Sequence, residues 1–98
     1  MGASGLTPIK HFGSWVSRSN NTVYQASTDG IACGVAENVS YPQVRGMSDG
    51  SNPPTTIRMV TNHYGSSGAY SGGCLPVKQG HYWKITGATY VYWLPLEP

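Results

Sequence analysis

Two stretches that predict surface loops carry side chains suited to binding a hydroxyl-rich ligand. They combine carboxylate, amide and imidazole groups, which hydrogen-bond hydroxyls, with tyrosine rings that can stack on a sugar face. Binding residues often lie on loops, because a rigid β scaffold positions them. For any single one of these residues, an ordinary solvated turn is the simpler interpretation. The predicted ligand-binding residues are Asp49, Asn52, Asn62, His63, Tyr64 and Tyr70.

The sequence offers no set of residues suited to catalysis. It has four acidic residues, and two of them, Asp29 and Asp49, lie in turn motifs that favour Asp for backbone reasons. A carboxylate pair for glycoside hydrolysis is therefore not evident. Either cysteine together with His63 would supply a nucleophile and a base, but neither cysteine lies in a motif that lowers the pKa of a thiol. We predict that the chain is not an enzyme.

The two cysteines and three histidines lack the spacing of a metal site. No C-x-x-C or H-x-x-x-H pattern links them. We therefore predict no bound metal and no cofactor; the alternative is a metal site on the axis of an oligomer, made by one histidine from each of three chains. Cys33 and Cys74 each lie in an apolar, strand-like run, so we expect both thiols to be buried and reduced. A disulfide between them is the alternative, because sequence spacing does not fix the distance between two Cα atoms.

Composition points to an all-β domain with an uncharged but polar surface. Only 10% of the 98 residues are charged, whereas glycine (13) and proline (7) are frequent. Ordinary soluble domains contain about 25% charged residues. The six Lys and Arg residues are spread singly, so no basic run follows a nucleic-acid backbone. No run of about 18 apolar residues predicts a membrane helix. We expect neither nucleic acid nor membrane as a partner.

The densest apolar content lies in two strand-like segments, 82–86 and 89–94, which flank a glycine. We predict that these segments form a β-hairpin. Side chains alternate between the two faces of a strand, so Trp83 and Ile85 point to the same side. We expect that side to be buried.

The second of these segments, residues 89–94, is apolar on both faces. Tyr90, Tyr92 and Leu94 share one face, and Val91 and Trp93 share the other. We expect both faces to be covered, one by the other sheet of the same chain and one by a neighbouring subunit. A sugar-stacking platform is the alternative, but large aromatics more often dominate cores and interfaces. The predicted core or trimer-interface residues are Trp83, Trp93, Tyr90, Tyr92 and Leu94.

The whole chain predicts one β-sandwich domain. No window shows helical periodicity over three turns. About eight short strands, separated by turn signals every 8–12 residues or so, indicate a sandwich or jelly roll. We assign this domain to residues 9–98. We expect residues 1–8, which are small and polar, to be a leader or the stub of a linker from a longer parent. Met1 fits either a cloning start or an internal translation start.

Five segments of the chain together carry a family likeness. They are Asp29-Gly30, Pro53-Pro54-Thr55-Thr56, the run from Pro76 to Gly80, the run from Tyr82 to Gly87 and the run from Tyr92 to Leu96. This combination resembles the C-terminal domain of bacteriophage tail spikes and tail fibres. The likeness covers residues 22–96, and its Pro-Val-Lys-x-Gly turn is shared with the trimeric jelly rolls of the C1q and tumour-necrosis-factor type, to which this domain is similar.

The resemblance implies a homotrimer at the distal end of a fibre. Its partners would be two further copies of itself, the upstream part of the parent protein and bacterial surface polysaccharide. Its place would be the virion tail tip, after synthesis in the host cytoplasm. We therefore expect host-receptor recognition through surface glycan; a purely structural module that caps trimer assembly is the alternative. Phage tips with an axial metal tend to carry a His-x-His pair, whereas His11, His63 and His81 are isolated.

Overall fold

The computed structural model describes residues 10–97, and this part of the chain is built from strands and loops without a helix. The prediction of an all-β fold is confirmed. The predicted leader, residues 1–8, lies outside the described residues. The strands are β1 (His11–Phe12), β2 (Val16–Arg18), β3 (Tyr24–Gln25), β4 (Gly30–Val39), β5 (Gln43–Asp49), β6 (Ile57–Asn62), β7 (Ala69–Val77), β8 (Tyr82–Thr86) and β9 (Tyr90–Glu97).

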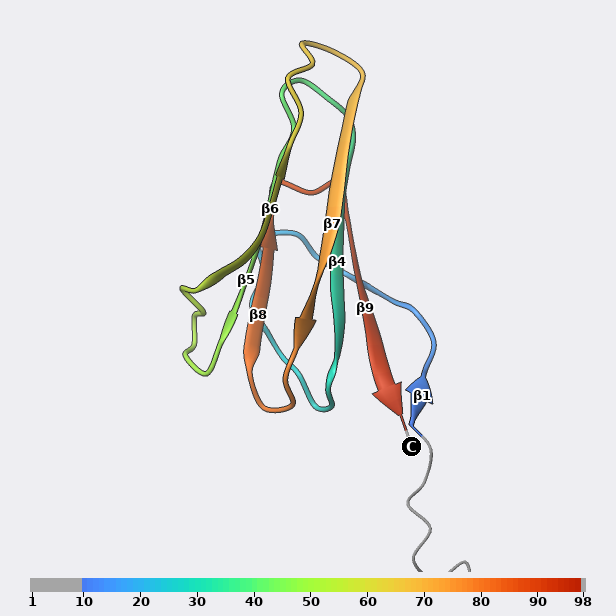
Figure 1. The fold of residues 1–98 in the computed structure, drawn as a ribbon, viewed down its shortest axis with the longest axis vertical. Helices are drawn as coiled ribbons and strands as arrows, with labels where there is room; N and C mark the ends of the chain where they lie inside the picture. Colours follow the sequence, from blue (N-terminus) through green and yellow to red (C-terminus); the bar gives the residue numbers. More distant parts are fainter. Residues whose placement is uncertain (1–9, 98) are drawn as a thin grey trace, which may run out of the picture.

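Two antiparallel sheets face each other in a sandwich (Figure 1). In the five-stranded sheet β1 and β2 both pair with β9, which is followed by β4 and β7; the four-stranded sheet has the order β3-β8-β5-β6. Most connections cross from one sheet to the other. The order β2-β9-β4-β7 facing β3-β8-β5-β6 is that of a jelly roll, in which two Greek keys close the sandwich. The predicted architecture is therefore confirmed.

The predicted hairpin between residues 82–86 and 89–94 is wrong. Strand β8 pairs with β3 and β5, whereas β9 pairs with β4 and with the N-terminal strands, so the two lie in opposite sheets. The chain crosses between the sheets at Gly87, whose φ of +77° and whose packing against the Gln43 carbonyl leave no room for a Cβ. Alternating polarity specifies which side of a strand is buried, but not which strand it hydrogen-bonds.

The core lies between the sheets and centres on two tryptophans. Trp83 of β8 and Trp93 of β9 stack with their ring centroids 5.4 Å apart and their planes 16° apart. Both are buried, as are their neighbours Ile85 and Val91, and the burial of Trp83 with Ile85 confirms the predicted inward face of residues 82–86. Opposite them, β4 presents small residues; a Cβ added to Gly34 would lie 2.6 Å from the Ile85 side chain. The small face of β4 therefore lets the two sheets approach closely.

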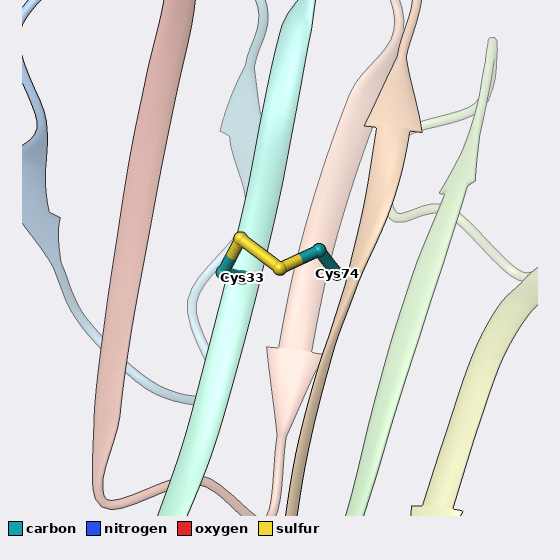
Figure 2. Close-up of a disulfide and its surroundings, with 2 residues drawn as sticks. All are labelled: Cys33 and Cys74. Atoms are coloured by element: carbon teal, nitrogen blue, oxygen red, sulfur yellow. A yellow bond between two sulfur atoms is a disulfide. The ribbon is translucent and has the colours of Figure 1, made fainter.

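Cys33 and Cys74 form a disulfide, so the prediction of two reduced thiols is wrong (Figure 2). The antiparallel register of β4 and β7 places the two residues directly opposite each other, with their Cα atoms 4.1 Å apart. A close pair of this kind brings the sulfur atoms within bonding reach. The bond closes a loop of 41 residues, which stabilises the fold by about 4 kcal/mol in a chain-entropy model. Cys33 is buried and Cys74 is exposed.

Trp93→Ala should lower the free energy of unfolding by roughly 3–5 kcal/mol, because it removes half of the stacked pair and leaves a cavity between the sheets. Urea unfolding with the disulfide intact measures this change. Trp15→Ala is the matched control: Trp15 is 58% exposed and touches only the edge of Tyr92, so its loss should cost about 1 kcal/mol. Equal losses in the two variants would contradict the central role of the stack.

Candidate functional site

A hollow of about 160 Å³ lies at the end of the sandwich where the 39–42 and 63–68 connections meet (Figure 1). We call it the tip hollow, and it lies far from β1 and from the last residues of β9, which are together at the opposite end. Three of its residues belong to the ligand-binding set that the sequence predicts. The residues that line it are Tyr41, Gln43, Asn62, His63 and Tyr64.

Strand pairing and loop hydrogen bonds hold the tip hollow in shape. Gln43 and Asn62 are opposite each other in the β5–β6 register. Beyond them the ladder is continued by loop bonds, since the His63 amide donates to the Pro42 carbonyl at 3.1 Å and the Tyr41 amide donates to the Gly65 carbonyl at 2.6 Å. The two connections therefore form one unit, and the sheet below them fixes their positions.

Both tyrosines of the tip hollow are presented to solvent. Tyr64 is 91% exposed and Tyr41 is 61% exposed. Tyr41 also has a φ of +48°, a left-handed conformation that costs energy in a residue other than glycine. Strained backbone of this kind is found preferentially at binding sites, because the surrounding structure must hold it. An exposed aromatic ring on a strained loop contributes little to the core.

The tip hollow is equipped for an uncharged, hydroxyl-rich ligand. Two amides and an imidazole supply hydrogen-bond donors and acceptors beside two phenol rings, while no Lys, Arg, Asp or Glu lines the hollow. Its volume is below the 300–1,000 Å³ or so of pockets that enclose a drug-sized molecule. A shallow site with aromatic rings and amides suits one unit of a saccharide chain. It lacks the two carboxylates of a glycoside hydrolase.

The structure separates the other predicted ligand residues from the tip hollow. Asp49 ends β5, and Asn52 follows in the connection to β6, which lies in the other half of the molecule in Figure 1. Tyr70 lies within β7 rather than in a loop. The sequence analysis missed Tyr41 and Gln43. No motif in the sequence marks these two residues, and only the pairing of β5 with β6 brings them beside residues 62–64.

Asp49 organises its own loop. Its carboxylate accepts hydrogen bonds from the backbone amides of Ser51, Thr55 and Thr56 at 2.8–2.9 Å. These amides, led by that of Thr55, hold the pKa of the carboxyl group well below its usual range, because they stabilise the charged form. The loop therefore closes around Asp49, whose oxygens are engaged by the chain itself.

The outer face of the five-stranded sheet is the second notable surface. Three rows of residues on β9, β4 and β7 point away from the core. None of these residues is charged, and Tyr90 and Val35 are 46% and 37% exposed. We call this set the apolar face. Its rows are Leu94–Ile31–Pro76, Tyr92–Cys33–Cys74 and Tyr90–Val35–Gly72.

The outer face of the four-stranded sheet is different. Its three central rows each contain a charged side chain, namely Arg45 opposite Thr86, Lys84 opposite Met47, and Asp49 opposite Tyr82. A charged outer face is what a sheet in contact with water shows. An uncharged outer face with several large side chains typifies a surface that another polypeptide covers. The predicted interface residues Tyr90, Tyr92 and Leu94 lie on the apolar face, whereas Trp83 and Trp93 lie in the core.

A carboxylate borders the apolar face. Glu37 lies beside Tyr90, and hydrogen bonding to its carboxylate and the negative charge of that carboxylate raise the pKa of Tyr90 above its ordinary value. Tyr70 and Tyr92 lie near enough to Tyr90 to raise it further. Phenol hydroxyls thus gather at this edge of the face, where each can donate a hydrogen bond to a covering chain.

Comparison with known proteins identifies no relative. No family model matches the sequence, and neither a curated protein nor a solved structure is significantly similar to the chain. Within residues 10–97, no three His, Cys, Asp or Glu side chains come close enough to hold a metal ion. The same residues include no long apolar helix that would cross a membrane.

Asp49→Asn should lower the melting temperature by a few degrees at pH 7 and by less at about pH 3. The amide keeps one acceptor oxygen, so it cannot bind all three backbone amides. The pKa of Asp49 is lowered by folding, so its stabilisation is complete above the unfolded-state pKa of about 3.9 and is lost as the pH falls below it. Thermal melts of the unaltered protein and of Asp49→Asn at pH 7 and at about pH 3 test this prediction. The same difference in melting temperature at the two pH values would contradict it.

Proposed function

We propose that the chain is a receptor-binding module of a phage tail spike or fibre that binds bacterial surface glycan through the tip hollow. The observation that carries this proposal is the pair of exposed tyrosines, Tyr41 and Tyr64, held around amide side chains on a loop with strained backbone. Aromatic rings contact the C–H faces of sugars, and amides bind their hydroxyls. The lack of charge in the hollow favours neutral sugars.

The arrangement of the chain supports this proposal. The 39–42 and 63–68 connections lie at one end of the sandwich, and β1 and the end of β9 lie at the other (Figure 1). A module that is joined to a fibre beside β1 would therefore point its tip hollow toward a cell. The jelly-roll strand order also agrees with the architecture that the resemblance implies.

A second function, trimer assembly, is favoured by the apolar face. Tyr90 and Val35 of this face are 46% and 37% exposed, and covering their apolar surface with another copy of the same face removes that surface from water, which is favourable. Another copy is the occupant that we propose, because the face carries no charge for a partner of opposite charge to recognise. We take the number of copies to be three, as in the trimeric jelly rolls that the sequence resembles.

Tyr64→Ala and Tyr41→Ala should each weaken glycan binding by about tenfold or more, because each removes a ring that stacks on the sugar. Binding to a printed panel of bacterial lipopolysaccharides and capsular polysaccharides, followed by adhesion to the bacteria that supply the best ligand, measures this loss. Tyr82→Ala, on the outer face of the four-stranded sheet, is the tyrosine-matched control. If both tip variants bind like the unaltered protein, the tip hollow is not the glycan site.

Val35→Glu should convert the trimer to monomers, because it places a charge on β4, the middle strand of the apolar face. Light scattering during size-exclusion chromatography gives the mass, and circular dichroism verifies that the fold persists. Val60→Glu makes the same change at a 49% exposed position on the four-stranded sheet and should leave the trimer intact. A monomeric unaltered protein would refute assembly through this face. A structural module without ligand would show the trimer but no binding to any polysaccharide.

A further inference from the structure

A second cavity, larger than the tip hollow, lies away from it and has a different chemistry. Its volume is about 600 Å³, and its walls include residues that begin β4, end β7 and begin the approach to β8. Most of the lining is apolar, with Phe12, Ile31 and Leu96 on one side. We call it the basal cavity. The proposed tip function makes no use of it.

A β-bulge positions an arginine in the basal cavity. In the β5–β6 register Gly46 is opposite Met59 and Met47 is opposite Ile57, so Arg58 is an extra residue without a partner. A bulge redirects the side chain that it inserts, and bulges are frequent beside functional sites. The Arg58 Nε donates to the Ser48 carbonyl at 3.0 Å, which fixes the guanidinium against the cavity wall. Its terminal amino groups have no partner in the hydrogen bonds of residues 10–97.

A rigid turn between β7 and β8 brings Lys78 and His81 to the same cavity. Gly80 has a φ of +85°, and its amide donates to the Ala26 carbonyl at 2.8 Å, while the Ala26 amide donates back to the His81 carbonyl at 2.9 Å. The Gln79 amide donates to the Asp29 carboxylate at 2.7 Å. These bonds hold the turn in place before any ligand arrives, which lowers the entropic cost of binding.

The charges of the basal cavity favour a ligand with one negative charge. Arg58 and Lys78 are cationic, and Asp29 is the only acidic residue of the lining. One oxygen of Asp29 is engaged by the Gln79 amide. With neutral His81 the lining therefore carries one net positive charge. Arginine binds carboxylates through paired hydrogen bonds, and the apolar wall offers a surface for the C–H face of a sugar ring.

We propose that the basal cavity binds a saccharide unit that carries a carboxylate, such as a uronic acid. The carboxylate lies between Arg58 and Lys78, and the ring rests on the apolar wall beside Phe12 and Leu96. The inference takes its ligand class from the proposed glycan function, but the site is separate from the tip hollow. The protein would then recognise neutral and acidic units of a polysaccharide at two different places.

Titration of the ¹⁵N-labelled full chain with sodium D-glucuronate, followed by amide NMR spectra, tests this proposal. Saturable shifts are expected at Gln79, Gly80 and His81, and D-glucose should not produce them. Arg58→Gln should weaken glucuronate binding about tenfold, the loss of a charge-assisted hydrogen bond pair. Arg45→Gln is the matched control. The Arg45 Nε also donates a hydrogen bond, to the side-chain oxygen of Gln43, but Arg45 lies on the outer face of the four-stranded sheet, away from the cavity. It should leave binding unchanged.

Lys78→Gln is a second test, because Lys78 is exposed and lies outside the bulge. It should also weaken glucuronate binding, and it remains informative if Arg58→Gln disturbs the bulge. The absence of saturable shifts, or unaltered binding in both variants, would overturn the proposal. Equal binding of inorganic phosphate at the same ionic strength would also overturn it, because the site would then recognise any anion. Tyr64→Ala separates the two proposals: it should abolish glycan binding at the tip while the glucuronate shifts persist.

Discussion

The stack of Trp83 on Trp93 is the contact on which the rest of the molecule depends. It joins one strand of each sheet, and it fits because β4 presents alanine and glycine to the opposite sheet. The disulfide then fixes β4 to β7 within one sheet. In a domain of this size the buried fraction of the surface is modest, so one large contact and one covalent bond account for much of the stability.

A sandwich built in this way has two outer faces and two ends, and these differ in chemistry. One outer face is charged and the other is not. One end has exposed tyrosines and amides, and the basal cavity has cationic groups and an apolar wall. A β scaffold holds such surfaces at fixed separations, so assembly and ligand binding can occupy different parts of the same small domain.

Assembly and binding would reinforce each other. Three copies that pack through the apolar face would present three tip hollows in the same direction. A single shallow hollow binds a sugar weakly, but several hollows that engage a repetitive polysaccharide together gain affinity without any new contact. Such avidity suits a polymer whose units recur along a cell surface. In such a trimer the apolar face and the tip hollow would serve one function, because packing through the apolar face would set the directions in which the tip hollows point.

The sequence alone determined the all-β class, the approximate strands and the inward face of β8, because polarity that alternates along a strand is a local property. Only the tertiary structure decided that these strands lie in opposite sheets, that Cys33 meets Cys74, and that Tyr41 joins Tyr64 while Asp49 and Tyr70 lie elsewhere. These outcomes depend on hydrogen-bond partners distant in the chain. The register between such partners, which side-chain alternation does not encode, sets which residues become neighbours.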